Sequence, residues 1–313
     1  MRQSWKVFLA LLILITSFMF DGCTDDRYSI AVPVCTCVLR GTGLTLDKNQ
    51  STPLPPREDA VYVHVPNAVI NSFIDNLLTK ASEQVWYPGA GITFLGLLNK
   101  QGDIPVIDDP DLSSGKYGEV VWSPQGGSEG AEIAQRCRDL WGRAAIPDGL
   151  ILIIARDLIN TDGSSTGLSG FVEADKKVIE RNGGNDLCNF PRNLTKEDMK
   201  GKFILLNDPQ PYVNPNPYTK DFWSVVLAHE MGHVLLLGHG DGEDNNGNSL
   251  VPPNPGSRKF DEFCDADEFK MEGTEGKVSL MTEHAGHVKN ITELQKELAR
   301  TVAKLMPGAV GPP

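Results

Sequence analysis

Apolar and polar positions alternate along the chain with two different periods, which together predict a fold of strands and helices. Residues 60–65, AVYVHV, alternate apolar and polar side chains and predict a strand, whereas residues 68–86 repeat apolar side chains at helical spacing. A last amphipathic helix is predicted over residues 290–306. The apolar runs GITFLGLL, GLILIIA, GLSGFVEA and KFILLN predict four further strands, at residues 91–98, 149–155, 167–174 and 202–207.

The order of these elements predicts one large domain of the mixed α/β (α+β) class over residues 59–307, with a short tail at residues 308–313. Residues 99–148 are less regular, and we interpret them as an insertion in this domain. They contain an acidic loop with prolines, then a predicted strand at residues 118–122 and a predicted helix at residues 131–143.

The start of the chain has the pattern of an export signal. Arg2 and Lys6 give a positive start, and residues 7–20 form a nearly unbroken apolar run. This run is too short and wrongly flanked for a stable membrane span, so residues 1–22 are predicted to be a signal peptide. The protein is therefore expected to be exported.

Cys23 follows this apolar run directly, and Gly22-Cys23 resembles a bacterial lipoprotein processing site. Phe20 and Asp21 depart from the usual residues of such a site. Lipidation of Cys23, which would anchor the protein to a membrane, and simple secretion are both open. Residues 23–58, polar and rich in proline from residue 42 onward, are predicted to be an N-terminal tether.

Composition limits the classes of partner. The 313-residue chain has 40% hydrophobic residues, enough for a large core, and its 41 acidic and 29 basic residues give a formal charge of -12. No basic patch indicates binding to nucleic acid or to an anionic membrane surface. The six cysteines, at positions 23, 35, 37, 137, 188 and 264, suit an oxidising compartment, and the sequence leaves their pairing open.

The candidate chemistry lies in residues 227–241, LAHEMGHVLLLGHGD. A helix capped by Thr219 or Asp221 is predicted to enter this stretch. On that helix His229 and His233 are four residues apart, so both imidazoles project from one face and can bind one metal ion. Glu230 lies about 100° further round the helix, outside the ligand set but within reach of a water at the metal.

His239 can be a third ligand only if the helix ends before it. In a continuous helix, the six residues from His233 to His239 would turn the side chain of His239 about 120° away from that of His233. Glycine ends helices readily in the left-handed conformation, and Gly238 is in place for this, so Leu236 is expected to continue the last helical turn. If the helix instead continues through Gly238, an acidic residue further along, Glu262 first or Asp265, becomes the alternative third ligand.

The stretch HEMGHVLLLGH resembles the signature of the metzincin clan of zinc endopeptidases, H-E-x-x-H-x-x-G-x-x-H, and is most similar to its matrixin branch. The three ligand positions and the glutamate match, whereas Leu236 stands where the clan has glycine. The resemblance implies a catalytic zinc held by His229, His233 and His239, with Glu230 as general base and then acid. It also implies a twisted mixed sheet with an active-site helix and a C-terminal helix.

Two further features follow from the same resemblance. The clan has a tight turn whose methionine lies beneath the metal, and VSLMTEH supplies Met281 in the corresponding place. Glu283 and the residue after Met281 do not match a known branch, so the branch stays unassigned. The clan binds an extended peptide along an edge strand, which the element order places at residues 167–172, with Gly170 and Phe171 near the metal.

The loop after His239 offers a weaker candidate site. Asp241, Asp244 and Asn246 carry oxygen ligands of the kind that Ca²⁺ prefers, but Gly242 interrupts the pattern of an EF-hand loop. A solvated acidic loop is the favoured interpretation. No pattern indicates an oligomeric state.

Together these features predict an exported, zinc-dependent endopeptidase that hydrolyses peptide bonds of protein substrates. The alternative is a surface-attached binding protein that keeps the fold, with or without a structural zinc, and does not turn over a substrate. Glu230 discriminates between them, because a binding protein has no need of a carboxylate at that position.

Overall fold

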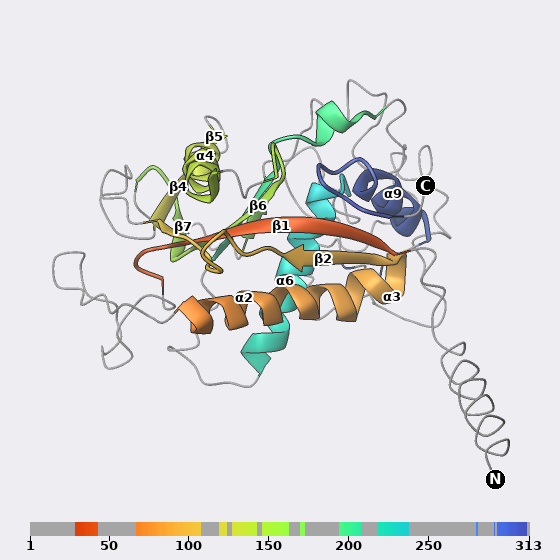
Figure 1. Ribbon diagram of the computed structural model, residues 1–313, viewed down its shortest axis with the longest axis horizontal. Coiled ribbons are helices and arrows are strands. Elements are labelled where there is room, and N and C mark those ends of the chain that lie inside the picture. The colour runs from red at the N-terminus through yellow and green to blue at the C-terminus, as the bar shows by residue number, and fades with distance from the viewer. Residues whose placement is uncertain are drawn as a thin grey trace, which may run out of the picture.

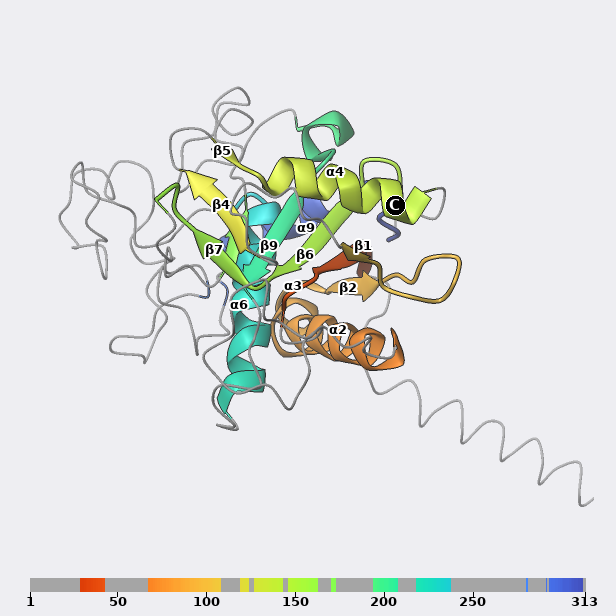
Figure 2. The same cartoon turned by 90° about the vertical axis from the view of Figure 1, so that its left-hand side faces the viewer.

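The structure, a computed structural model, describes residues 29–42, 67–107, 119–123, 127–142, 146–162, 170–172, 194–207, 218–237, 280, 291 and 293–311. In these parts of the chain one mostly parallel sheet separates a helix on one face from several helices on the other (Figures 1 and 2). The fold belongs to the mixed α/β class, as predicted.

The main sheet has the strand order β2-β1-β6-β9-β8, and β3 also pairs with β1. Neighbouring strands are parallel, except that β8 is antiparallel to β9. Its members are β1 (Ile30–Leu39), β2 (Ile92–Gly96), β3 (Val106–Ile107), β6 (Leu150–Ala155), β8 (Gly170–Val172) and β9 (Phe203–Asn207). A second, smaller sheet has the order β5-β4-β7 and consists of β4 (Glu119–Ser123), β5 (Gly127–Ser128) and β7 (Asp157–Ile159).

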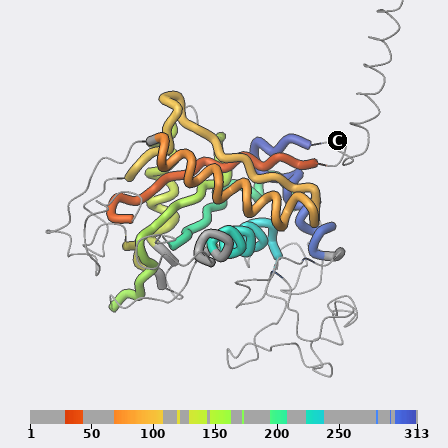
Figure 3. Tube along the Cα trace, turned by 90° about the horizontal axis from the view of Figure 1, so that it is seen from below, coloured from red at the N-terminus to blue at the C-terminus, as the bar shows by residue number. Residues whose placement is uncertain are grey.

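Helices cover both faces of the main sheet. Helix α4 lies against one face, and α2 and α6 lie against the other, where they contact each other (Figures 2 and 3). The helices are α2 (Asn67–Ala81), a π-helical turn η3 (Ser82–Trp86), α3 (Tyr87–Ala90), α4 (Gly130–Trp141), a 3₁₀ turn η5 (Lys196–Met199), α6 (Tyr218–Val234) and α9 (Glu293–Ala303). Among the described residues no helix is both long and apolar enough to cross a membrane.

Most elements predicted from periodicity are confirmed where the structure describes them. The helix expected over residues 68–86 is formed by α2 and η3, and the last helix is formed by α9. Strands β2, β4, β6, β8 and β9 also form where expected. The strand predicted at residues 60–65 lies outside the described residues.

The prediction that residues 23–58 form a tether is wrong for Ile30–Leu39. This segment is β1, a strand inside the main sheet, paired with β2 and β3 on one edge and with β6 on the other. All of its residues except Ala31 are buried. The physical reason is its apolar run, IAVPVCTCVL, which can cover both faces of a sheet at once. The folded domain therefore begins well before residue 59.

Pro33 is accommodated in this inner strand by its position. The Ala31 N–H donates to the carbonyl of Val310 at 2.7 Å, on the edge of β1 that faces β6. Pairing with β6 on that same edge begins only at Val34, opposite Leu150. Pro33 lies between these two pairings, where a missing N–H leaves no ladder bond unmade.

Alternate residues of the inner strands face two separate cores. In β6, Leu150, Leu152 and Ile154 pack in the core that includes α2, α6 and α9, whereas Ile151, Ile153 and Ala155 pack in the core under α4. Both sets are at most 1% exposed. The prediction that this strand is buried on both faces is confirmed.

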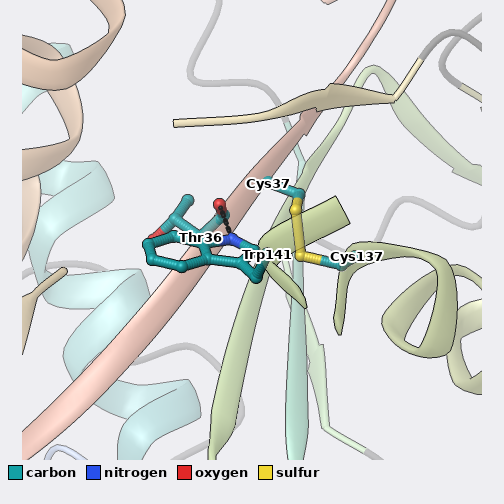
Figure 4. The surroundings of a disulfide bond; sticks show 4 residues. All are labelled: Thr36, Cys37, Cys137 and Trp141. Carbon is teal, nitrogen blue, oxygen red and sulfur yellow. Dashed lines mark hydrogen bonds between the residues drawn. A yellow bond between two sulfur atoms is a disulfide. The ribbon is translucent and has the colours of Figure 1, made fainter. Parts of the chain in front are cut away.

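A disulfide joins α4 to β1 in the core under α4 (Figure 4). Cys37 and Cys137 are joined with a Cα–Cα distance of 6.0 Å, and Trp141 donates its indole N–H to the Thr36 carbonyl at 3.0 Å. Cys35 keeps a free, buried thiol, whose pKa is raised by burial. Helix α4 lies within the segment interpreted as an insertion, yet it provides one whole covering layer of the sheet and is integral to the fold.

Candidate metal centre

Helix α6 carries the first two histidines, and tertiary packing fixes it along most of its length. It contacts α2, η3, β8 and β9, and residues 224–232 are all buried. The helix begins at Tyr218, so the predicted caps Thr219 and Asp221 lie inside its first turn rather than before it. Packing of apolar residues along this length positions the helix.

The rings of His229 and His233 are each oriented by a backbone carbonyl. Nδ1 of His229 lies 2.7 Å from the oxygen of Leu280, and Nδ1 of His233 lies 2.9 Å from the oxygen of Leu237. A carbonyl oxygen only accepts hydrogen bonds, so each Nδ1 carries the proton and donates. In a neutral ring with the proton on Nδ1, Nε2 carries the lone pair, which is the form that binds a metal ion.

These two Nε2 atoms face each other at 3.0 Å, with the ring planes at 87°. Two lone pairs repel at this distance unless they share a proton or a metal cation. Zinc binds imidazole at about 2.0–2.1 Å with tetrahedral angles, which places two ligand nitrogens about 3.3 Å apart. The observed spacing is close to this value, so the histidine pair fits one zinc ion.

Glu230, next to His229 on the helix, is 7% exposed. Burial disfavours its charged form and raises its pKa to about 8. A cation close to the carboxylate would act in the opposite direction and lower the pKa again. The side chain is thus a buried carboxyl group whose protonation state depends on its surroundings at neutral pH.

Helix α6 ends at Val234, and the chain turns away at Leu236, not at Gly238 as expected. Leu236 has a φ of 63°, in the left-handed region that favours glycine. Its N–H donates to the His233 carbonyl and the Leu237 N–H donates to the Gly232 carbonyl, both at 2.9 Å. This pair of bonds is a Schellman motif with Leu236 in the position that glycine usually occupies. Burial explains the exception, because the Leu236 side chain is only 5% exposed in the core.

The predicted third ligand, His239, lies outside the described residues. His239 follows two residues after Leu237, the last described residue of this segment. The alternatives Glu262 and Asp265, and the candidate calcium ligands Asp241, Asp244 and Asn246, also lie outside the described residues. Within the described parts of the chain, no cluster of three or more histidine, cysteine, aspartate or glutamate side chains could hold a metal.

Leu280, the residue before the predicted turn methionine, reaches His229. Leu280, fully buried, supplies the carbonyl that orients His229. Met281 is the next residue and is itself outside the described residues, so its own placement remains a prediction. Sequence reasoning missed the role of the Leu280 and Leu237 carbonyls, since backbone groups leave no residue-type signal.

Gly170 and Phe171 lie in β8, the last strand of the main sheet as the structure describes it. The residues pair with Leu206 and Leu205 of β9, and β8 contacts α6. Among the described strands β8 is therefore at the edge of the main sheet and beside the histidine helix; that Gly170 and Phe171 lie near a metal and bind substrate stays a prediction.

The chain matches no known protein family and no curated protein sequence. Its function must therefore be argued from the geometry of the histidine pair, the buried glutamate and the edge strand.

Proposed function

We propose that this protein is an exported, zinc-dependent endopeptidase with a metzincin-like catalytic domain. The observation that carries the proposal is the pair of Nε2 atoms 3.0 Å apart, on two rings whose Nδ1 atoms each lie within hydrogen-bond distance of a backbone carbonyl oxygen. Oriented imidazoles of this kind are typical of metal ligands, whose other ring nitrogen is held by an outer hydrogen-bond partner.

His229 and His233 would provide two of the three protein ligands, and His239 is the proposed third. The chain leaves the helical path at Leu236, at the position where the metzincin signature has its glycine. This early end of the helix supports His239 as the third ligand, because the His239 side chain no longer has to point in the direction that a continuous helix would impose. When bound, zinc would polarise both a water molecule and the scissile carbonyl.

Glu230 is proposed as the proton carrier. It would accept the proton of the attacking water and deliver it to the leaving amine. A carboxyl group in a buried site, where its pKa is raised from 4.5 to about 8, is suited to hold a proton at neutral pH between these two steps. Its burial also argues against the binding-protein alternative, since a buried carboxylate destabilises a fold that makes no use of it.

Strand β8 is proposed to bind an extended peptide of a protein substrate. An edge strand offers backbone N–H and C=O groups on its outer side, with which a peptide can pair as an added strand. Contact between β8 and α6 would bring such a peptide towards the histidine helix. Protein or peptide chains are therefore the proposed substrate class.

Export is proposed from the N-terminal pattern, and the disulfide between Cys37 and Cys137 is consistent with an oxidising compartment. If Cys23 is lipidated, only five residues lie between it and Ser29, the first described residue, so the six steps along the chain reach at most about 22 Å. The catalytic domain would then be held directly at the membrane surface rather than on a long tether.

The proposal is tested by cleavage of a peptide library with the purified exported protein. Cleavage is expected to stop with 1,10-phenanthroline, to continue with the non-chelating 1,7 isomer, and to return on adding zinc. The variant Glu230→Gln should keep its fold and zinc while losing at least about 100-fold in kcat, a typical effect of removing a general base. A zinc-loaded wild type that cleaves nothing would favour the binding-protein alternative, and cleavage that survives the chelator would exclude a catalytic metal.

A further inference from the structure

A tryptophan from a distant helix is hydrogen-bonded to the histidine helix. Trp86, 0% exposed, donates its indole N–H to the carbonyl of Ala228 at 3.0 Å. Ala228 immediately precedes His229, and 142 residues of sequence separate it from Trp86. Trp86 is the last residue of the π-helical turn η3, which joins α2 to α3.

The π-helical turn determines where Trp86 points. A π turn includes one residue more than an α turn, and one residue corresponds to about 100° of rotation about the helix axis. Had the segment stayed α-helical, Trp86 would face a different direction. Turns of this kind occur mostly as single insertions and frequently at functional sites.

Contacts with β2 hold this turn in place. The Phe94 N–H donates to the Ser82 hydroxyl oxygen at 2.9 Å, and that hydroxyl donates to the Phe94 carbonyl at 3.4 Å. The Phe94 ring also packs edge-on against Trp86, with ring centroids 6.4 Å apart. These contacts with β2 hold Trp86 in addition to its hydrogen bond to α6.

The hydrogen bond to Ala228 fixes the rotation of α6 about its own axis. Side chains reach about 5–6 Å from a helix axis, so a rotation of about 10° moves an imidazole by about 1 Å. Functional sites tolerate displacements of only about 0.5 Å. A small rotation of α6 would therefore separate His229 Nδ1 from the Leu280 carbonyl that orients it.

We propose that Trp86 is a positioning residue for the metal site, and that it acts through the Ala228 carbonyl on His229. This inference rests on the proposed zinc function. Trp86 acts from outside the site, and its indole N–H holds the helix at the angle at which His229 meets the Leu280 carbonyl.

Trp141 provides a matched control. It is 3% exposed, and its indole N–H also donates to a backbone carbonyl, that of Thr36, at 3.0 Å. It lies in the core under α4, on the other face of the sheet from α6. A change at Trp141 removes the same kind of hydrogen bond from a comparable core without contacting the histidine helix.

The experiment measures the affinity for Co²⁺ and its visible absorption spectrum in wild type, Trp86→Phe and Trp141→Phe. Because phenylalanine also leaves a cavity, each tryptophan is in addition replaced by 3-benzothienylalanine, which keeps the ring volume and lacks only the N–H. We expect both changes at Trp86 to weaken cobalt binding about tenfold and to shift the spectrum, while the changes at Trp141 lower stability alone.

Two results would overturn the inference while leaving the proposed function intact. One is wild-type affinity and an unchanged spectrum in the 3-benzothienylalanine variant at position 86. The other is an equal loss of affinity at positions 86 and 141, which would indicate general destabilisation. A folded wild type that binds no cobalt would instead refute the proposed function, and the positioning role with it.

Discussion

Strain and burial oppose each other at Leu236. Its φ of 63° places the Cβ atom too close to the backbone, at a cost of about 1–2 kcal/mol relative to glycine. Its side chain is 5% exposed, and burial of a leucine contributes about 1.5–3 kcal/mol. These two effects predict an unusual order of stability for Leu236→Ala and Leu236→Gly, because alanine keeps the backbone strain and loses most of the buried apolar surface.

We expect Leu236→Ala to lower the free energy of unfolding by about 2–4 kcal/mol. Leu236→Gly removes slightly more apolar surface but also relieves the strain, so it should be more stable than the alanine variant by about 1 kcal/mol. In an ordinary helical position the order is reversed, with glycine about 1 kcal/mol less stable than alanine. Urea unfolding measures the difference in unfolding free energy between the two variants, provided that both show the same dependence on urea concentration.

Leu235 is the matched control, since it is fully buried and is not among the described residues with positive φ. There Leu235→Ala should be more stable than Leu235→Gly. If alanine is the more stable substitution at position 236 as well, the helix does not turn at Leu236. The support that this turn gives to His239 as a ligand would then be lost.

Three further predictions concern other parts of the molecule. Burial raises the pKa of Glu230 from 4.5 to about 8, so in chelator-treated protein its protonated form stabilises the fold at low pH. As pH rises from about 4.5 to 8, the wild type should therefore lose a few kcal/mol of unfolding free energy relative to Glu230→Gln. Parallel pH profiles of the two proteins would contradict this. Replacing Cys37 and Cys137 by serine opens a loop of 100 residues and should cost about 3–5 kcal/mol by urea unfolding, with unchanged cobalt affinity in the folded protein. Cys23→Ser should move the protein from the membrane to the soluble fraction, unless export ends in simple secretion, in which case both forms are soluble.

Local periodicity predicted those elements whose burial follows one clear pattern. The run in β6 and the helical repeat of α2 are of this kind. Strand β1 was missed because it begins only a few residues after the predicted export signal, and its proline and two cysteines do not follow the usual pattern of an inner strand. Its place in the sheet depends on pairing with β2 and β6, whose partner residues lie about 60 to 116 positions away.

In the candidate metal site, too, local patterns predicted some features and missed those that depend on distant contacts. Spacing along a helix was sufficient to place His229 and His233 on one face. The end of the helix was predicted at Gly238 from conformational preference alone, whereas burial of Leu236 overrides that preference. The carbonyl of Leu280 and the indole of Trp86 reach the site from 51 and 142 residues away, and no local pattern reports such contacts.

The central claim is that His229 and His233 bind one zinc ion through Nε2. Zinc content of the folded protein, combined with X-ray absorption at the zinc edge, tests it most directly. We expect one zinc per chain, surrounded by imidazole nitrogens at about 2.0–2.1 Å, and loss of that zinc in His229→Ala and His233→Ala. A folded protein that binds no zinc at neutral pH, or a zinc with sulfur ligands at about 2.3 Å, would contradict it.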